Sequence, residues 1–538
     1  MQNTDYRPIT LTPLSPIHIG CDEDYVPTNF VIQDNLLHYL DMTMLADLLE
    51  DDERRKLGES QTIGAIQYFF KSRRDRFAPL AHHIVGIASD IAQEYETKAG
   101  RPVQSLTNSN HTYNLFPISR TSYRSLDLSP YLPGSSLKGS IRTAWLNTIN
   151  QGRPLSDAKE NNQALQQRLL GYSAGQFEND PLRHLHVADA HHEEDPAPTH
   201  ILYAVSKKKR PSEHGTPELK VFLETIPGLL SDAFSGEIRI CPDNKDGASN
   251  LTWQHLCDVC NAFYWPQLEA ELDHTHLAKM LDPAWRQVIQ DLLREELAEL
   301  RAKQQGFLLR VGKHSGAESV TLDVVRDIKI LGKKGAPPSY RKETTKETTE
   351  KRFASERKDA ANNLLPFGWL WVESCQDAYQ YLSIAMRDRL RPHTLVLREA
   401  QQNRLEQIEQ ARKQRDAARQ AAEQKRLQAE QTARLEAAAA QAKAAELAKL
   451  SENMRQIVQL RDAIDKRLVI GQKIPVSDHF FGGHIMALVQ QALASQDWSS
   501  EERNALAAML EERASKLINL DAKDFRKKLK LAALRGQA

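Results

Sequence analysis

The chain has 538 residues, 41% of them hydrophobic, and its 71 Lys+Arg and 71 Asp+Glu give a formal net charge of zero. The length suffices for two or more buried cores, and the balanced charge argues against a protein that coats nucleic acid over its whole surface, while allowing a local basic groove. Five cysteines do not make a disulfide framework in so long a chain. The sequence shows neither a signal peptide nor a bilayer-spanning apolar run, so we expect a cytoplasmic protein without membrane contact.

The first hundred residues predict strands followed by helices. Residues 11–20 and 29–41 have the pattern of short strands, and an acidic turn lies between them. Residues 42–100 carry apolar side chains at helical spacing, which predicts a helical insertion.

A glycine-rich segment, residues 131–145, follows the insertion and reads Tyr-Leu-Pro-Gly-Ser-Ser-Leu-Lys-Gly-Ser-Ile-Arg-Thr-Ala-Trp. Gly134 allows close approach of a ligand, and Ser135 and Ser136 offer hydroxyl groups where a helix begins. The unpaired N–H groups of a first helical turn and the helix dipole attract anions. The segment therefore predicts a phosphate site.

Two basic side chains extend this site, because Lys138 and Arg142 are four residues apart and share a helix face. Gly134 and Gly139 have the spacing of a nucleotide-binding P-loop, but Ser140 follows where that motif requires Lys. A P-loop is therefore not supported, and a capped surface helix without a ligand is the plain alternative.

The middle of the chain alternates between strands, helices and a polar segment. Residues 182–189 have an alternating strand pattern, and further strands and then helices are predicted as far as residue 302. A second glycine-rich basic segment occupies 307–316, and Leu-Pro-Phe-Gly-Trp-Leu-Trp-Val fills 365–372. Residues 333–362 have hardly any apolar side chains, which predicts a mobile loop.

The C-terminal part has a different composition. No Gly or Pro occurs between Pro392 and Gly471, and residues 401–450 are dense in Ala, Gln, Glu, Lys and Arg, which predicts a long charged helix. Its large apolar residues keep no sustained heptad, so the helix is either single and exposed or weakly paired in a coiled coil. Residues 451–538 predict a small helical domain, in which Ser499 begins one helix.

Four blocks of this sequence resemble the RAMP superfamily of CRISPR ribonucleoproteins, and their layout is most similar to the fifth subunit of Csm (type III-A) effector complexes. The blocks are Pro-Ile-His-Ile-Gly at 16–20, the glycine-rich segment at 133–144, Arg-Val-Gly-Lys-His-Ser-Gly at 310–316, and Pro-Phe-Gly-Trp at 366–369. The resemblance covers about residues 8–395 and says nothing of the rest.

The resemblance implies an α+β fold with two ferredoxin-like (RRM-like) modules and helical insertions, followed by the long helix and the small all-α domain. The expected domains are 1–180, with the helical insertion 42–100 and the glycine-rich loop 131–142; 181–395, with the loop 333–362; 396–450; and 451–538.

The function implied by the resemblance is that of a non-catalytic subunit that binds guide RNA (crRNA). It would cap the filament of backbone subunits near the 3′ end of the guide and support guide maturation in antiviral defence, without a cofactor. The implied partners are guide RNA, target RNA, other Csm-type subunits and host nucleases that trim the guide. The RNA-binding residues are predicted to be His18, Gly20, Gly134, Ser135, Ser136, Lys138, Gly139, Arg142, Arg310, Gly312, Lys313, Ser315 and Gly316.

Two catalytic alternatives remain open. The chain could be a RAMP endoribonuclease that cuts guide precursor or target RNA, with His18 as general acid or base, because imidazole titrates near neutral pH. The acidic turn Asp22-Glu23-Asp24 could hold a metal ion for the same reaction. A structural or RNA-contacting His18 and a solvated turn are the preferred interpretations. A non-catalytic subunit of a Cmr-type complex is a further alternative.

Two groups of cysteine and histidine residues are candidate metal sites. Cys257 and Cys260 precede His274 and His276, but a single residue between the histidines is unlike a zinc finger, and the segment has a helical pattern. A cluster of four histidines is a weaker candidate, and its members are His184, His186, His191 and His192. We therefore predict no metal site.

Overall fold

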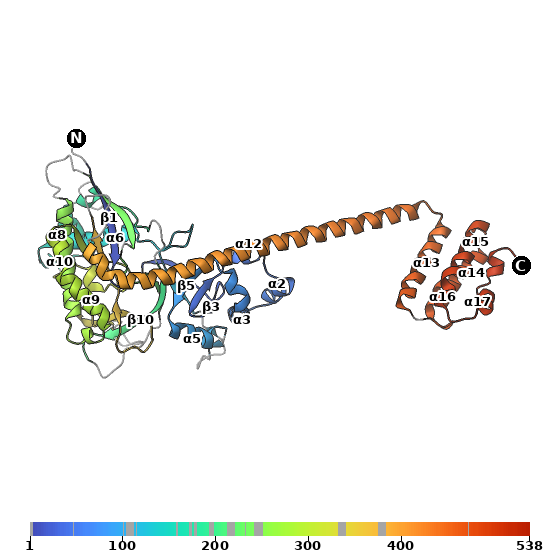
Figure 1. Cartoon of the computed structure of the whole chain (residues 1–538), viewed down its shortest axis with the longest axis horizontal. Helices are drawn as coiled ribbons and strands as arrows, with labels where there is room; N and C mark the ends of the chain where they lie inside the picture. The colour runs from blue at the N-terminus through green and yellow to red at the C-terminus, as the bar shows by residue number, and fades with distance from the viewer. Residues whose placement is uncertain are drawn as a thin grey trace. The chain divides into compact units, whose positions relative to one another are not determined.

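The computed structural model divides into two compact units, residues 1–420 and residues 421–538, which are described separately. It describes residues 4–537 except for 47, 101, 104–111, 114–115, 158–159, 172–174, 177–179, 193–197, 212–220, 232, 242–250, 332–339, 375–383 and 472. The predicted α+β fold with a helical C-terminal part is confirmed (Figure 1).

The strands all lie in the first unit. They are β1 (Asp5–Pro13), β2 (Gly20–Tyr25), β3 (Phe30–Gln33), β4 (Leu36–Tyr39), β5 (His83–Ile87), β6 (Pro102–Val103), β7 (Thr112–Tyr113), β8 (Ile118–Thr121), β9 (Leu185–Val187), β10 (His200–Lys208), β11 (Phe222–Thr225), β12 (Phe234–Ile240), β13 (Gly306–Arg310), β14 (Ile328–Leu331), β15 (Tyr340–Thr345), β16 (Glu350–Ser355), β17 (Leu365–Pro366) and β18 (Trp369–Glu373).

The helices occur throughout the chain. Those before residue 384 are α1 (Met42–Ala46), α2 (Asp51–Gly58), α3 (Ile63–Lys71), α4 (Arg74–Phe77), η1 (Ala78–Leu80), α5 (Ser89–Lys98), α6 (Gly134–Asn150), α7 (Asn162–Leu170), η3 (Pro181–His184), α8 (Trp253–Leu272), η4 (Leu277–Lys279), α9 (Pro283–Arg294), α10 (Glu296–Ala302) and α11 (Ala317–Val320). The later ones are α12 (Ile384–Ala448), α13 (Glu452–Ile470), η5 (Phe481–Met486), α14 (Ala487–Ala494), α15 (Ser500–Met509), η6 (Leu510–Ala514), α16 (Ser515–Leu517), α17 (Ala522–Lys528) and α18 (Leu531–Leu534).

The first sheet has the strand order β13-β18-β1-β12-β9, and all its neighbours are antiparallel. Helix α6 lies between β1 and β9 in the sequence, and α8 lies between β12 and β13. The order β18-β1-β12-β9 with these two helices is that of a ferredoxin-like β-α-β-β-α-β unit, to which β13 adds an edge strand. Helix α8 packs on β13 and α6 packs against α8 and β9, so both helices cover this sheet.

A second sheet of nine strands has the order β2-β8-β11-β10-β5-β4-β3, with β16 and β17 attached through β10. It is mixed, because β8 runs parallel to β11 and β5 runs parallel to β10. One core joins the two sheets and contains the fully buried Trp253, Trp369 and Trp371.

The two sheets interleave along the chain, whereas the sequence analysis expected one module in 1–180 and another in 181–395. Each sheet takes strands from both ranges, since β1 pairs with β12 and β18, and β8 pairs with β11. Long-range pairing of this kind leaves no mark in the local hydrophobic pattern, so these boundaries were not readable from it.

Two further expectations differ from the structure. The helical insertion 42–100 contains α1 to α5, but it also contains β5, whose five residues are all buried. A strand buried on both faces reads as a continuous apolar run and is easily taken for a helix. The predicted loop 333–362 contains β15 and β16, and β16 pairs with β10 and buries Phe353 and Ala354. Residues 333–339 of that loop lie outside the described residues.

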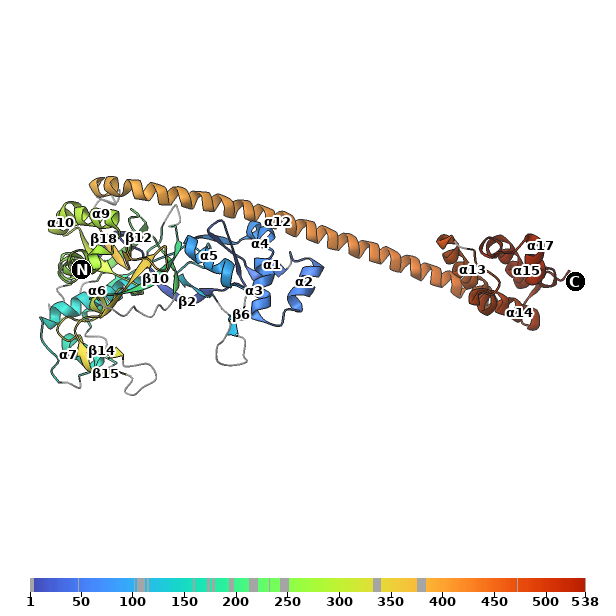
Figure 2. The ribbon, with the colours of Figure 1, turned by 90° about the horizontal axis from the view of Figure 1, so that it is seen from below.

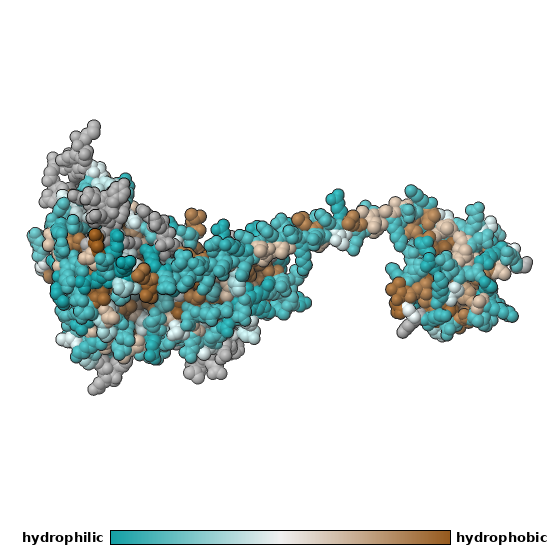
Figure 3. Space-filling view, in the orientation of Figure 1, coloured by the Kyte–Doolittle hydropathy of each residue, from teal (hydrophilic) through white to brown (hydrophobic). Residues whose placement is uncertain are grey.

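Helix α12 begins earlier than predicted, at Ile384, and contains Pro392. Within the first unit, Figure 2 shows the first part of α12 running along one side of the sheets. Met386 and Leu390 are fully buried there, and Arg404 donates a hydrogen bond to the carbonyl oxygen of Thr199 at 2.7 Å. Every residue from 421 to 446 is exposed, and Figure 3 shows hydrophilic and apolar side chains mixed along this stretch.

The second unit has a helical core of its own, formed by α13 to α18. Ser499 caps α15, accepting from Glu502 N while the Glu502 side chain accepts from Ser499 N, which confirms the helix start expected there. Leu506, Leu510 and Leu517 are buried, as their helical spacing predicted. No helix in the described part of the chain is long and apolar enough to cross a membrane.

Candidate nucleic-acid interface

The four sequence blocks meet in three dimensions. The backbone N–H of Lys313 donates to the carbonyl oxygen of His18 at 2.8 Å, and the Ser140 hydroxyl donates to the carbonyl oxygen of Arg310 at 2.9 Å. Gly312 has φ of 79°, and a Cβ atom there would lie 2.4 Å from the His18 carbonyl oxygen. The glycine of the third block therefore permits close packing against the first block.

The fourth block joins the same junction. The N–H of Gly368 donates to the carbonyl oxygen of Pro16 at 2.9 Å, and Gly368 has φ of 94°. A Cβ atom at this position would lie 2.4 Å from the carbonyl oxygen of Val311. Much of the glycine pattern that suggested ligand binding thus serves contacts between backbone segments.

The start of α6 differs from the predicted phosphate site. The N–H of Gly134 donates to Asp189 Oδ1 at 2.7 Å, so a carboxylate of this chain already lies at the helix N-terminus. A Cβ atom on Gly134 would lie 2.2 Å from the carbonyl oxygen of Val187. Gly134 is buried because the helix start packs directly on the segment that follows β9, which the sequence pattern could not show.

The basic pair on α6 is engaged internally. Lys138 Nζ donates to the carbonyl oxygen of Leu185 at 2.8 Å, and burial lowers the pKa of Lys138. Arg142 Nη1 lies 2.7 Å from Asp180 Oδ2, and Arg142 Nη2 donates to Gln166 Oε1 at 3.2 Å. These contacts correct the expectation that both side chains are free to bind phosphate.

Arg310 is also a structural residue, with only 3% of its surface exposed. Its Nη1 donates to Glu271 Oε2 at 3.0 Å, its Nε donates to the Phe367 carbonyl oxygen at 3.0 Å, and its guanidinium lies 4.5 Å from the Trp369 ring centroid. Lys351 Nζ lies 2.5 Å from the same Glu271 oxygen. The predicted RNA contact through Arg310 is therefore corrected to a buried ion cluster.

His18 is completely buried. Its Nδ1 lies 2.7 Å from the carbonyl oxygen of Glu224, and because a carbonyl oxygen only accepts, Nδ1 carries the proton. Burial lowers the pKa of His18 to about 4. The ring is therefore neutral at physiological pH and inaccessible, which suits a structural residue better than a general acid.

The remaining predicted residues differ in exposure. Gly20, Ser135, Gly139 and Lys313 are exposed, and nothing lies within 4 Å of a Cβ placed on Gly139. Ser136 is partly buried and Gly316, with φ of 88°, caps α11. The hydroxyl of the buried Ser315 donates to the Gly312 carbonyl oxygen at 3.0 Å.

A cavity of about 400 Å³ opens beside the start of α6. Its lining includes Ser135 and Lys138 of α6, together with His186 and Arg239. The last two are cross-strand partners on β9 and β12, which places both side chains on one face of the sheet. Sequence reasoning missed Arg239 because strand register between distant segments cannot be read from local pattern.

The acidic residues 22–24 lie in β2 and not in the predicted turn, and they do not present three free carboxylates. Glu23 accepts a hydrogen bond from the Tyr123 hydroxyl at 2.6 Å and lies 3.5 Å from the buried Arg120. The Arg120 guanidinium lies 3.7 Å from the Tyr123 ring centroid and 4.5 Å from that of Tyr25. Burial and the Glu23 hydrogen bond raise the pKa of Tyr123 to about 12. Glu23 therefore holds the edge of the second sheet together.

The cysteine and histidine groups serve structural roles. Cys257 and Cys260 are buried on α8, and burial raises the pKa of both thiols. His274 Nδ1 accepts from the backbone N–H groups of His276 and Leu277, each at 3.2 Å. Of the histidine cluster, His186 lines the cavity beside α6, and His184 lies on η3. His191 contacts the Tyr131 ring, and His192 contacts the Phe234 ring. Within the described residues no group of three or more potential ligands is placed to hold a metal ion.

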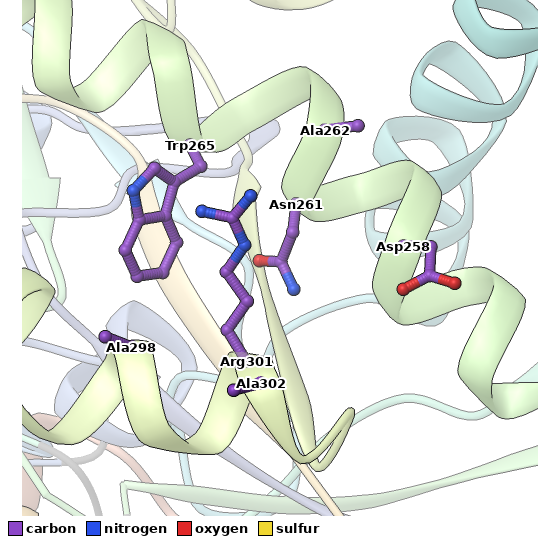
Figure 4. Close-up of a pocket in the computed structure, with 7 residues that line it drawn as sticks. All are labelled: Asp258, Asn261, Ala262, Trp265, Ala298, Arg301 and Ala302. Carbon is purple, nitrogen blue, oxygen red and sulfur yellow. The ribbon is translucent and has the colours of Figure 1, made fainter.

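Another cavity of about 400 Å³ lies between α8 and α10 (Figure 4). Arg301 projects between Trp265 and Asn261 in this view and lies 4.6 Å from the Trp265 ring centroid. Asn261 bonds the backbone at Gly306 and Leu308, at 3.0 and 3.1 Å. Asn261, which lines this cavity, therefore holds β13 against α8.

Residues 10–244, which contain the first two of the four blocks, match the RAMP superfamily. The chain is also similar to "CRISPR system Cms protein Csm5" of Methanocaldococcus jannaschii, with 28% identity over 143 residues, and of Streptococcus thermophilus, with 27% identity over 151 residues. The predicted resemblance to this CRISPR protein is thus confirmed.

The matched parts are limited in length. They cover 25% and 27% of this chain and 28% and 39% of the two relatives, so the chain spans about a third of the curated relatives it matches. Two solved structures are also similar, each with a TM-score of 0.40. One is described as "Cryo-EM structure of Csm-crRNA-target RNA ternary complex in type III-A CRISPR-Cas system" (17% identity, 69% of this chain, 100% of that chain). The other is "Crystal structure of T.onnurineus Csm5" (19% identity, 68% of this chain, 99% of that chain).

Proposed function

We propose that this chain is a guide-RNA-binding subunit of a type III-A Csm complex, with no catalytic role. It would cap the filament of backbone subunits near the 3′ end of the guide and support guide maturation in antiviral defence. Guide RNA, target RNA and other Csm subunits are its proposed partners, together with host nucleases that trim the guide.

The observation that carries this proposal is the exposed surface around the block junction in a protein similar to Csm5. Ser135 and Gly139 on α6 and Lys313 beside His18 face solvent, and His186 and Arg239 are among the residues that line the adjoining cavity. Hydroxyl, backbone and cationic groups of this kind bind phosphodiester oxygens without reading base sequence. A subunit that must accept guides of many sequences requires such contacts.

The alternative of an endoribonuclease is less well supported by the site. His18 is neutral and buried, and the exposed Glu23 of β2 is engaged by Tyr123 and Arg120. A general base must lie within hydrogen-bond reach of the proton that it removes. His18 lacks that access and Glu23 already has two partners, so the surface is better suited to holding RNA than to cutting it.

Affinity purification of the full chain from its native host, followed by sequencing of the bound RNA and mass spectrometry of the bound proteins, tests the proposal. We expect CRISPR-repeat-derived RNA together with other RAMP subunits. Recovery of the chain without RNA and without any RAMP partner would refute the assignment. Metal-dependent cleavage of labelled RNA by the purified protein would refute the absence of catalysis.

A further inference from the structure

Between residues 451 and 537, the arginine and lysine side chains differ in whether they have a partner within the protein. Each described arginine between 451 and 537 is engaged within the protein. Arg455 and Arg503 donate to backbone carbonyl oxygens, Arg467 lies over the Phe480 ring, and Arg461, Arg513, Arg526 and Arg535 pair with carboxylates. These arginines therefore belong to the fold.

The lysines of the same range behave in the opposite way. All are exposed, and the structure gives none of their ammonium groups an ion pair or hydrogen bond; they are Lys466, Lys473, Lys516, Lys523, Lys527, Lys528 and Lys530. Five of these seven fall between 516 and 530. An unpaired ammonium group is available to an external anion, so this short stretch carries most of the free positive charge of residues 451–537.

Three of these lysines, Lys523, Lys527 and Lys530, lie on α17 or directly after it. Phe525 and Leu529 point into the core of the unit, whereas Lys523 and Lys527 are four residues apart and lie on the opposite face of α17. Lys530 follows directly, and its left-handed backbone (φ of 50°) begins the turn into α18.

Most carboxylates near this face form ion pairs or hydrogen bonds with other groups of the protein. Glu511 Oε1 lies 2.7 Å from Arg526 and Glu511 Oε2 lies 2.6 Å from Arg535, which ties η6, α17 and the end of α18 together. Asp521 caps α17, where its Oδ1 accepts from the N–H groups of Lys523 and Asp524 at 2.9 and 2.8 Å. Asp524 lies in the first turn of α17, where the helix dipole favours an acid.

We propose that the lysine face formed by Lys523, Lys527 and Lys530 binds the phosphodiester backbone of a nucleic acid. It is a second contact of this chain, independent of residues 8–395, which resemble the RAMP superfamily and are called the RAMP region. The described residues after Val476 contribute no exposed large hydrophobic side chain. Protein interfaces and membrane-surface helices require apolar anchors, whereas phosphate contacts require only charge. The composition of the face therefore favours a nucleic acid over a protein or a membrane.

The test measures binding of full-length protein to single-stranded polyuridine RNA by fluorescence anisotropy over a range of salt concentrations. The variant is Lys523→Gln/Lys527→Gln/Lys530→Gln. Its matched control is Lys425→Gln/Lys466→Gln/Lys473→Gln, which removes the same charge from three exposed lysines elsewhere in the second unit. We expect the first variant to bind about tenfold more weakly and to lower the slope of log affinity against log salt by about 2. The control should bind as the wild type.

The outcomes distinguish this inference from the function proposed above. Equal affinities and slopes for wild type, variant and control would refute the lysine face and leave the RAMP-region proposal intact. A loss in the variant that persists when Lys313→Gln is also present would support two separate contacts. Repeating the titration with polythymidine DNA shows whether the face discriminates between the two backbones; a backbone contact predicts similar affinities.

Discussion

The basic side chains singled out in the RAMP region and the lysines near the end of the second unit differ in whether they are free to bind an external anion. Lys138, Arg142 and Arg310 belong to motifs that suggest phosphate binding, yet each is held by this chain's own carbonyl and carboxylate oxygens. The lysines of α17 belong to no recognised motif, yet they are exposed and unpaired. A cation within a glycine-rich motif can therefore serve the fold, and free charge has to be located from contacts.

The largest expected effect comes from the buried ion cluster. Replacing Arg310 with Met should lower the free energy of unfolding of the RAMP region by about 3–5 kcal/mol, because it leaves Glu271 as a buried carboxylate with Lys351 as its remaining ion-pair partner. Chemical denaturation followed by tryptophan fluorescence measures the loss. The control Lys313→Met, in the same block but exposed, should change stability by no more than about 0.5 kcal/mol. Equal stabilities of the two variants would show that Arg310 is not structural.

The two glycines of α6 offer a matched pair. Gly134→Ala should cost about 1–3 kcal/mol of stability, since its Cβ would meet the Val187 carbonyl oxygen. Gly139→Ala has open space around its Cβ and should be neutral or stabilise the helix by about 0.5–1 kcal/mol. Thermal unfolding of both variants measures the difference. A Gly134→Ala protein as stable as wild type, but impaired in RNA binding, would show that this glycine contacts RNA and does not serve packing.

A pH dependence follows from His18. Burial lowers the pKa of His18 to about 4, while the unfolded chain has the ordinary value near 6.5, so the unfolded state binds more protons between these values. The contribution of His18 to stability is therefore present above about pH 6.5 and is lost as pH falls toward about 4. His18→Asn keeps a donor for the Glu224 carbonyl oxygen but does not titrate. At about pH 5 we expect it to remove about 1–2 kcal/mol of the acid-induced loss. Parallel pH profiles for the two proteins would contradict a buried neutral His18.

The smallest expected effect concerns Lys313. Its ammonium group is exposed beside the block junction, so Lys313→Gln should weaken binding of guide RNA about threefold to fivefold, for all guide sequences alike. Electrophoretic mobility shifts with two unrelated guides measure this change. Lys466→Gln, which removes the same charge from an exposed lysine of the second unit, serves as a mobility control. A loss confined to one guide would indicate base readout and contradict a backbone contact.

The sequence predicted much of the fold but less of the site, for physical reasons. Local pattern was enough for the start of α6 at Gly134, the cap of α15 at Ser499 and the long α12, because helix signals are local. It was insufficient for the pairing of β1 with β12 and for the packing of Gly134 on Val187, which join distant segments. The partners of Arg310 and the alignment of His186 with Arg239 depend on that same pairing. Exposure of Lys313 likewise follows from tertiary packing.

Ultraviolet cross-linking of full-length protein to labelled guide RNA, with mass spectrometric mapping of the attachment sites, tests the central claim most directly. The account predicts cross-links in the peptides that contain Lys313 and the exposed residues Ser135 and Gly139, and their loss when unlabelled guide competes. Cross-links confined to other parts of the protein, with both of these peptides unmodified, would contradict the assignment of the block junction as the RNA-binding surface.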